Sequence, residues 1–377
     1  MAKSRNNAAP LSATELAGRW ALGLMSGTSL DGIDAALIRS DGLGAVETGP
    51  ARTLPYEEVF RARLRGVLGA KGPVAEVERE LTLLHAAAVD ALLRESGIAH
   101  GEVGVIGFHG HTILHAPEER RTWQIGDGAL LAAETGIDVV ADFRSRDVAE
   151  GGQGAPFVPL YHAALAAGME RPLAVLNLGG VGNVTWIGTA SESDAPPLVA
   201  FDTGPGNALI DDWVARHGLG SYDRDGALAV RGRIDERRLS ALLEDPYFER
   251  PPPKSLDRLD FTADAAEGLS PADGAATLAA FTAAAVAAAL PLLPAPPRRW
   301  VVTGGGRRNP AIMGELAHRL GAPVVGADSL GWDGDALEAQ AFAYLALRSC
   351  LGLPLSMPGT TGVRAPTCGG RFFPAPR

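Results

Sequence analysis

The spacing of hydrophobic positions predicts alternating strands and helices in the first half of the chain. Apolar runs at 20–25 and 33–38 flank a glycine-rich turn, which is typical of a hairpin. Over residues 74–96 apolar side chains recur every three or four positions, as they do on one face of a long helix. Further strands are predicted at 103–108 and 137–143, with a helix near 129–135 between them.

The second half repeats this order. It opens with a strand at 173–178, a glycine-rich turn and a strand at 184–187. The elements predicted after these are a strand at 198–201, helices at 207–217 and within the Ala-rich stretch 277–293, a short strand at 301–302, a helix at 310–320, a strand at 324–325 and a helix at 335–351. Two units of the same order predict a duplicated α/β architecture, with a ligand in the cleft between the two lobes.

The length of the chain, 377 residues, is consistent with two lobes because it exceeds the usual size of one domain. We expect a flexible tail at 1–18, an N-terminal lobe at 19–168 and a C-terminal lobe at 169–377. Cys350 and Cys368 stand alone and far apart, so neither a disulfide framework nor a cysteine metal site is indicated.

Charge and hydropathy exclude several classes of partner. The net charge of −10 argues against nucleic acid, because no basic stripe is available to neutralise a phosphate backbone. The polar N-terminus lacks the apolar segment of a secretory signal, and the stretch 277–293 is too short to span a bilayer. The sequence therefore predicts a cytoplasmic protein that does not bind membranes.

Lysine is scarce, and this scarcity bears on phosphate binding. Lys254 is followed by serine, yet no G-x-x-x-x-G precedes it, so a P-loop is excluded. Glycine is abundant instead, at 47 residues. If the protein binds phosphate, backbone N–H groups of glycine loops must make most of the contacts.

The first glycine loop follows the first predicted strand. Its residues are Gly27, Thr28, Ser29, Leu30, Asp31, Gly32, Ile33 and Asp34. Glycine permits a close approach to an anion, the two hydroxyls add donors, and the two carboxylates could hold water around Mg²⁺. The alternative is an ordinary hairpin turn closed by Asx and Ser hydrogen bonds.

A second loop carries Asp202 with Gly204 and Gly206, between a predicted strand and a helix. A carboxylate in that position suits a general base that faces a phosphate, although capping of the helix is an alternative. A third loop joins Gly304, Gly305 and Gly306 to Asn309, which looks like a helix cap before Pro310; a flexible connection is its alternative. A fourth begins at Asn177.

Two further motifs suggest other chemistry. His109 and His111 form an H-x-H pair after an apolar strand, as in zinc-dependent hydrolases. No second pair of ligands accompanies them, so a cleft histidine beside an exposed one is the simpler interpretation. Arg144 lies beside acidic residues at a strand end and suits bidentate binding of a carboxylate, with a surface ion pair as the alternative.

Taken together, these motifs resemble the anhydro-N-acetylmuramic acid kinases. The resemblance covers about residues 23–374 and rests on the segments 23–32, 124–127, 142–144, 151–156, 177–180, 202–207 and 304–310, in that order. It implies an actin-like ATPase fold of two RNase H-like lobes with a nucleotide cleft between them. It also implies ATP and Mg²⁺ as cofactors, a small amino sugar as substrate and a homodimer.

The implied reaction belongs to murein recycling. It opens the 1,6-anhydro ring of anhydro-N-acetylmuramic acid and phosphorylates O6, which gives N-acetylmuramic acid 6-phosphate and ADP. By this resemblance Asp202 is the base, and residues 27–34 bind the ATP phosphates. Gly204, Gly206, Gly304, Gly305, Gly306 and Asn309 bind the nucleotide, and the sugar contacts are His109, Thr112, Arg144, Asn177 and Glu338.

The sequence departs from the family pattern at two positions. His111 stands where the family usually has Gln, and Ala336 stands where a second acidic residue is common. Neither departure changes Asp202 or a residue of the phosphate loop. A metal-dependent hydrolase that uses His109 and His111 remains the alternative from another class, and a non-catalytic sugar- or nucleotide-sensing relative is the third.

Overall fold

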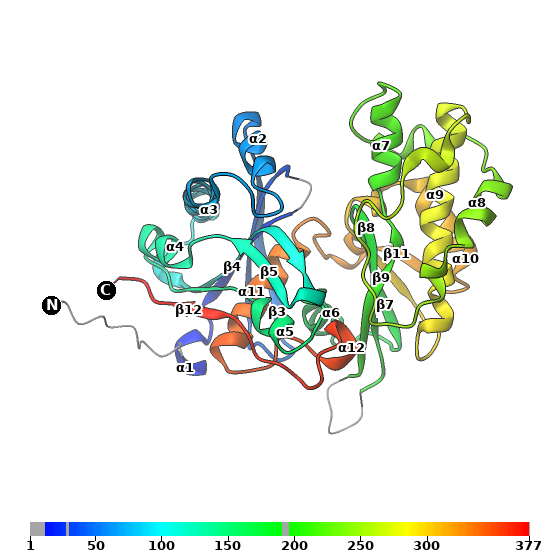
Figure 1. Ribbon diagram of the computed structural model, residues 1–377. Helices are drawn as coiled ribbons and strands as arrows, with labels where there is room; N and C mark the ends of the chain where they lie inside the picture. Colours follow the sequence, from blue (N-terminus) through cyan, green and yellow to red (C-terminus); the bar gives the residue numbers. More distant parts are fainter. Residues whose placement is uncertain (1–11, 28–29, 191–195, 377) are drawn as a thin grey trace. The chain divides into compact units, whose positions relative to one another are not determined.

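The computed structural model describes residues 12–27, 30–190 and 196–376 (Figure 1). The chain forms two compact units. One unit ends its first segment at Ala167 and resumes at Ala336, and the other is Gly168–Asp335. The expected C-terminal lobe at 169–377 is therefore wrong beyond residue 335, because the last 42 residues of the chain return to the first unit.

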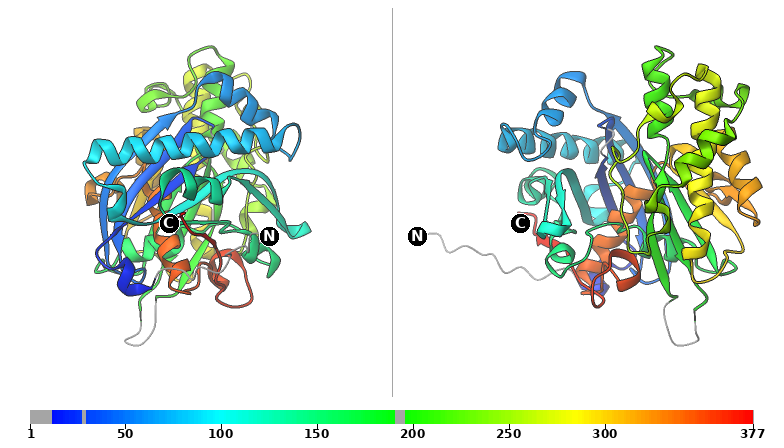
Figure 2. Two further views of the ribbon diagram at one scale, coloured as in Figure 1. Left: turned by 90° about the vertical axis from the view of Figure 1, so that its left-hand side faces the viewer. Right: turned by 45° about the vertical axis from the view of Figure 1, so that its right-hand side comes forward.

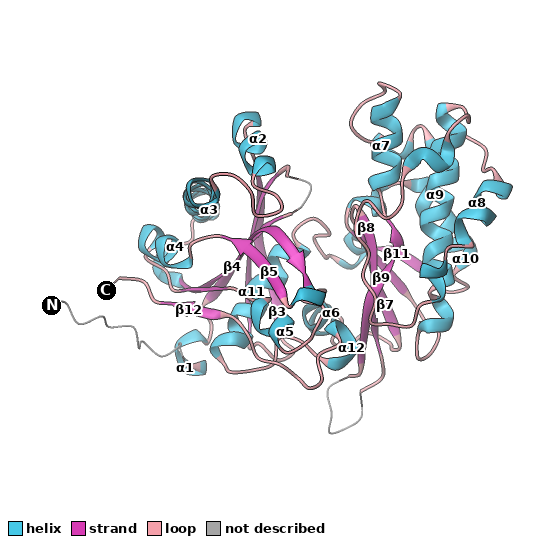
Figure 3. Cartoon of the chain, viewed as in Figure 1, coloured by secondary structure: helices cyan, strands magenta, loops and turns pink. Residues whose placement is uncertain are grey.

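The first unit is built on a mixed sheet with the order β12-β6-β4-β1-β2-β3, with β5 paired to β4 (Figure 3). β1, β2 and β3 form an antiparallel meander, and β4 and β6 continue the sheet parallel to β1. The strands are β1 Trp20–Ser26, β2 Gly32–Ser40, β3 Val46–Pro55, β4 Val103–Ala116, β5 Arg121–Ile125, β6 Val139–Ala141 and β12 Arg371–Phe373.

Helices cover this sheet, and the long helix α3 crosses it in Figure 2. Val77, Leu81 and Leu92, three of the apolar positions that predicted this helix, are buried in the core of the unit. The helices are α1 Ala13–Leu16, α2 Glu58–Gly66, α3 Val74–Ser96, α4 Gly128–Thr135, α5 Ser145–Ala149, α6 Pro159–Leu165, α11 Leu337–Cys350 and α12 Pro358–Thr361.

Two glycines explain why α11 belongs to the first unit. A Cβ atom on Gly23 of β1 would lie 1.7 Å from the Ala339 carbonyl oxygen, and one on Gly107 of β4 would lie 2.0 Å from that of Phe342. The helix backbone therefore rests directly on the strands, at a distance that only glycine allows. β12 then pairs with β6 and closes the sheet.

The second unit repeats the arrangement with the order β11-β10-β7-β8-β9. β7, β8 and β9 are antiparallel neighbours, and β10 and β11 continue parallel to β7. The predicted duplication is confirmed by this shared order, whereas the nucleotide cleft between the lobes stays a prediction. The elements are β7 Leu173–Leu178, β8 Val181–Ile187, β9 Leu198–Pro205, α7 Ala208–Arg216, α8 Glu236–Leu243, α9 Pro271–Ala288, β10 Trp300–Thr303, α10 Pro310–Arg319 and β11 Val324–Gly326.

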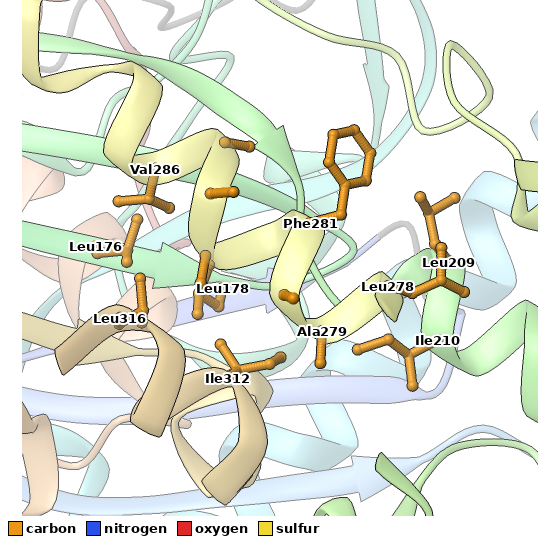
Figure 4. Close-up of a cluster of buried hydrophobic side chains, with 14 of the residues drawn as sticks. Leu176, Leu178, Leu209, Ile210, Leu278, Ala279, Phe281, Val286, Ile312 and Leu316 are labelled. Atoms are coloured by element: carbon orange, nitrogen blue, oxygen red, sulfur yellow. The ribbon is translucent and has the colours of Figure 1, made fainter. Parts of the chain in front are cut away.

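The Ala-rich helix α9 is the centre of the second core. Phe281 and Val286 of α9 pack with Leu209 of α7, Ile312 of α10 and Leu176 of β7 (Figure 4). The expectation that the stretch 277–293 is too short to span a bilayer is wrong, because the helical segment begins at Pro271 and, through Leu292, is long and apolar enough to do so. However, 72% of its most apolar window is buried inside the unit. Its composition therefore reflects burial on all sides within a core.

Several elements differ from the sequence prediction. β4 and β9 run eight and four residues beyond the predicted ends at 108 and 201, so the H-G-H-T segment and Asp202 lie in strands rather than loops. β3 and α2 were not predicted, because β3 has no buried residue and α2 buries only Phe60 and Leu64, which is too few to mark a helix in the sequence. In the expected tail, residues 12–18 include α1 with Leu16 buried, and residues 1–11 lie outside the described part.

Candidate active site

The predicted phosphate loop begins where β1 ends. Leu30 donates its backbone N–H to the Gly27 carbonyl oxygen at 3.1 Å and has a φ of 59°, in the left-handed region that a leucine rarely adopts. Its side chain is buried in the core, which holds this turn in place. Thr28 and Ser29 lie outside the described residues.

The rest of this loop packs against the sheet. Ile33 is buried in the core, and a Cβ atom on Gly32 would lie 2.3 Å from the Leu54 carbonyl oxygen on β3. Asp31 is exposed and Asp34 partly exposed, and the Asp34 carboxylate accepts a hydrogen bond from Thr53 Oγ1. Within the described residues of the loop, the polar side chains at its surface are therefore these two carboxylates.

A buried hydroxyl precedes the loop. Ser26 Oγ accepts a hydrogen bond from the Tyr56 hydroxyl at 2.8 Å and lies 2.9 Å from His111 Nδ1. Tyr56 and His111 are themselves buried. These side chains link the end of β1 to β4 and to the segment after β3, so they stabilise the start of the predicted phosphate loop.

The zinc interpretation of the H-x-H pair finds no support. His109 and His111 are both buried, so the expected exposed histidine is wrong. His109 Nδ1 donates to the Gly110 carbonyl oxygen, and Nε2 accepts from Arg144 Nε at 3.0 Å, which leaves no ring nitrogen of His109 for a metal. Within the part of the chain that is described, no group of three or more His, Cys, Asp or Glu side chains could hold a metal ion.

Three of the predicted sugar contacts come together in the first unit. Arg144 bonds to His109, and Glu338 on α11 is close enough to act on the charge of Arg144. The guanidinium also lies over the rings of Phe157 and Phe342, and the ring centroids of His109 and Phe342 are 4.5 Å apart. Burial lowers the pKa of Arg144 to about 10, while Glu338 and then Asp147 act in the opposite direction.

The segment after β6 holds Arg144 in place. Arg144 donates to the Gly154 carbonyl oxygen, and the Gly154 N–H donates to Asp147 at 2.7 Å. Asp147 is 1% exposed and also accepts from Thr361 of α12. The alternative of a surface ion pair is therefore wrong, because Arg144 donates to His109 and to the Gly154 carbonyl oxygen. Thr112, a fourth predicted sugar contact, lies on β4 and accepts from Gln124 Nε2.

The predicted base, Asp202, lies on β9, the edge strand of the second unit. It is partly buried, and its Oδ2 accepts the Leu256 backbone N–H at 2.9 Å. Burial raises the pKa of Asp202 to about 7, although the Leu256 N–H and the Lys254 ammonium lower it. The alternative role as a helix cap is wrong, because α7 begins only at Ala208, after Asn207.

The glycines near Asp202 are required by packing. A Cβ atom on Gly204 would lie 2.6 Å from Ala285 of α9, and one on Gly206 would lie 2.2 Å from the Gly179 carbonyl oxygen. The Asn207 N–H donates to that same oxygen at 2.7 Å. The second and fourth predicted loops are therefore in direct contact.

The third loop joins the same cluster. Gly304 has a φ of 70°, and a Cβ atom there would lie 2.5 Å from Asn177 Oδ1. On Gly305 and Gly306 the same atom would approach Asn207 and Leu178. Asn309 caps α10 as predicted, with Oδ1 accepting from the Ala311 N–H at 3.0 Å. Asn177 thus lies beside the glycine loop of the second unit, whereas the other predicted sugar contacts belong to the first.

Sequence reasoning missed Arg307, which rigidifies the third loop. Its side chain is only 3% exposed and donates to the Gly304 carbonyl oxygen and to the carboxylates of Asp328 and Asp335. A Cβ atom on Gly334 would contact this guanidinium. The two carboxylates lie 21 and 28 residues after Arg307, so local sequence offers no signal for the arrangement.

A cavity of about 370 Å³ lies in the second unit near this cluster. Leu219, Tyr222, Asp223, Arg224, Leu228 and Arg231 are among its lining residues. It adjoins the third loop, because a Cβ atom on the neighbouring Gly226 would lie 2.4 Å from Asn309 Oδ1. The lining is mostly apolar with a few charged groups, as is usual for small-molecule sites.

Comparisons with known proteins agree with the sequence motifs. The family model described as anhydro-N-acetylmuramic acid kinase matches residues 19–375. An anhydro-N-acetylmuramic acid kinase of Paramagnetospirillum magneticum is 61% identical over 93% of this chain and 98% of its own length. One from Rhodospirillum rubrum is 58% identical over 94% of both chains.

Among solved structures, component A of the (R)-2-hydroxyglutaryl-CoA dehydratase of Acidaminococcus fermentans has a TM-score of 0.46 and 14% identity. The match covers 87% of this chain and 99% of that one. At 58–61% identity over nearly the full length, the two kinases and the family model identify the relationship. The chain belongs to the anhydro-N-acetylmuramic acid kinase family.

Proposed function

We propose that this kinase uses ATP to convert 1,6-anhydro-N-acetylmuramic acid into N-acetylmuramic acid 6-phosphate and ADP, with Asp202 as the base. Water attacks C1 and gives its proton to Asp202, while the C1–O6 bond breaks. The electron pair of that bond goes to O6, which attacks the γ-phosphorus, and the bond from phosphorus to the bridging oxygen of ADP breaks. Capture of the leaving oxygen by the phosphoryl group makes the ring easier to open.

The proposal rests on the burial and the hydrogen bond of the Asp202 carboxyl. A general base works best when its pKa lies near the working pH, and burial raises the pKa of Asp202 to about 7. One carboxylate oxygen is held by the Leu256 N–H, so the side chain has a defined orientation. A simple surface aspartate would be a much weaker base.

For the nucleotide, we propose that the first glycine loop binds the phosphates and the cluster of Gly206 and Gly304–Gly306 binds the nucleoside. The cavity beside Asn309 has a volume and lining suited to a base or ribose. Carboxylate oxygens at Asp31 and Asp34 fit Mg²⁺ held through water and phosphate oxygens, since Mg²⁺ prefers oxygen ligands and keeps several waters. When bound, the ion would neutralise charge on the ATP phosphates.

For the sugar, we propose that Arg144 binds the lactyl carboxylate and that His109, Thr112, Asn177 and Glu338 are further sugar contacts. Arg144 is held by His109 and Gly154 before substrate arrives, so little side-chain entropy remains to be lost on binding. Glu338 beside the guanidinium suits a hydroxyl or amide N–H donor of the sugar. A homodimer and a cytoplasmic location belong to the same proposal.

The test is a product assay in water labelled with ¹⁸O. The wild type should release ADP and give a sugar 6-phosphate with the label at C1 and none in the phosphate. An Asp202→Asn variant should lose this reaction, whereas Asp211→Asn is the matched control and should retain it, since Asp211 on α7 is also a partly buried carboxyl whose pKa burial raises. Label in the phosphate, or full activity of Asp202→Asn, would contradict the proposed mechanism.

The assay also separates the other classes. Ring opening without ATP, dependent on stoichiometric zinc, would favour the hydrolase. ATP consumption with an ordinary hexose but not with the anhydro sugar would leave only the kinase class. Sedimentation of the purified protein measures the oligomeric state independently of these outcomes.

A further inference from the structure

We propose that Lys254 is a positioning residue for the reaction: its buried ammonium closes the segment that holds the backbone and the carboxylate of Asp202, and its positive charge favours the ionised carboxylate. The inference rests on the proposed role of Asp202 as the base. In the sequence, Lys254 was considered only as a possible P-loop lysine, and no P-loop motif precedes it.

The segment 245–256 covers the edge of the sheet at Asp202. The Asp202 N–H donates to the Lys254 carbonyl oxygen at 3.1 Å, and the Leu256 N–H donates back to Asp202 Oδ2 at 2.9 Å. The Tyr247 hydroxyl donates to the Asp202 carbonyl oxygen at 2.6 Å. Both the backbone and the carboxylate of Asp202 are therefore held by this one segment.

The side chain of Lys254 holds the segment together. It is a buried lysine, with the whole residue 8% exposed. Its Nζ donates to the carbonyl oxygens of Tyr247 at 3.0 Å and Phe248 at 3.4 Å, and lies 4.4 Å from the centroid of the Tyr247 ring. Pro251–Pro253 limit the backbone freedom of the residues just before it, so less backbone entropy is lost when the segment closes on the turn at Tyr247.

Burial of an ammonium is costly unless negative or polar groups compensate. Here the compensation comes from two carbonyl oxygens, from aromatic ring faces and from Asp202, whose charge acts on Lys254. The ammonium also acts on Asp202. It favours the ionised form of that carboxyl, whereas burial favours the protonated form.

The other charged or titratable groups that face this pair lie on the same segment and just after it. Arg250 disfavours the charge on Lys254, so that burial and Arg250 together lower the pKa of Lys254 to about 8. Burial, then Asp202, raises the pKa of Tyr247, and Asp260 acts on it in the same direction. Tyr247 thus stays a neutral donor throughout the working range.

The pKa values of Lys254 and Asp202 define the pH range in which the charge of Lys254 affects Asp202. Below about pH 8 Lys254 is charged and helps Asp202 to lose its proton. Above that pH Lys254 becomes neutral, but Asp202 is already ionised because the pH exceeds its pKa of about 7. Loss of the charge at residue 254 should therefore reduce turnover on the acidic side only.

The experiment compares the pH profile of kcat for wild type, Lys254→Gln and Lys254→Arg. Gln keeps a donor for the Tyr247 carbonyl without charge, and Arg keeps the charge. For Lys254→Gln we expect the acidic limb to move up by about one pH unit, with about tenfold lower turnover at pH 6 and near wild-type turnover at pH 9. Lys254→Arg should restore the wild-type limb.

A second measurement needs no variant at residue 254. Carbon-13 NMR of the Asp carboxyls, with Asp202 assigned by its loss in Asp202→Asn, reports the pKa of this group directly. In the wild type the Asp202 signal should show a second inflection near pH 8, where Lys254 loses its proton. This measurement decides the question if Lys254→Gln does not fold.

Two outcomes overturn the inference while the proposed function stands. One is a uniform loss of turnover at every pH in Lys254→Gln, which indicates a structural role only. The other is an Asp202 signal without the second inflection. Full activity of Asp202→Asn is a different result, because it removes the proposed base and with it the reason for the ammonium.

Discussion

The two units bury titratable side chains of different kinds. In the first, His85, His109 and His111 are buried in or near β4, and burial is the largest cause that lowers the pKa of each. In the second, burial raises the pKa of Asp202, and Lys254 beside it is buried as well. The first unit therefore keeps neutral histidines as hydrogen-bonding groups, whereas the second holds a carboxyl whose pKa of about 7 suits the proton exchange that we propose for Asp202.

The difference has a consequence for stability. A histidine with a lowered pKa binds fewer protons in the folded than in the unfolded chain, so acid destabilises the fold between its two pKa values. A carboxyl with a raised pKa binds more protons when folded, so stability is lost as the pH rises from about 4 to about 7. Asp202, the proposed base, thus lowers the stability of the second unit at neutral pH, whereas the histidines do not lower that of the first unit.

The largest expected effect concerns Asp202 of the second unit. Asp202→Asn should lower kcat by about 10²- to 10⁴-fold, because the general base is lost. The same variant should raise the Tm at pH 8, since a neutral amide needs no ionisation in a buried position and still accepts from the Leu256 N–H. Calorimetry at pH 5 and pH 8 measures the second effect. A lower Tm at pH 8 would show that the charge of Asp202 stabilises the unit.

The next effect tests the first unit. Arg144→Lys should raise KM for the anhydro sugar by about tenfold or more, because lysine lacks the planar fork that bonds His109 and presents paired donors to a carboxylate. KM for ATP should change little. Arg146→Lys, an exposed neighbour paired with Glu150, is the control. Equal effects on both KM values would place Arg144 elsewhere in the mechanism.

A third prediction concerns acid stability. His85 has a pKa of about 4 when folded, so protonation of this one group costs on the order of 3 kcal/mol below that pH. The free energy of unfolding in urea should therefore fall as the pH drops from about 6.5 to about 4. In His85→Phe the slope of this decline should be smaller. An unchanged slope would show that His85 is not the group that resists protonation.

The sequence predicted much of the fold because both sheets have regular hydrophobic periods. It failed where strands continue through polar residues: β4 includes His109 and Thr112, and β9 includes Asp202, and in each case the partner strand, not the local pattern, supplies the hydrogen bonds. Four glycine loops were recognised, yet Gly204 and Gly304 leave no room for a side chain because of close packing: Gly204 against the side chains of Ala285 and Phe248, and Gly304 against Asn177 and the Leu178 backbone. Arg307 and Lys254 were missed as site residues, because their partners are distant in sequence or are carbonyl oxygens that any residue could offer.

The smallest effect concerns the support of the phosphate loop. Tyr56→Phe removes the hydroxyl that donates to Ser26, just before Gly27, and should lower the free energy of unfolding by about 1 kcal/mol. KM for ATP should rise a few-fold and KM for the sugar should not change, because Ser26 adjoins the loop proposed to bind the phosphates. Tyr161→Phe is the control, since that buried hydroxyl donates to Gln340 of α11. If both variants alter KM for ATP equally, the Tyr56–Ser26–His111 network contributes only to the stability of the first unit.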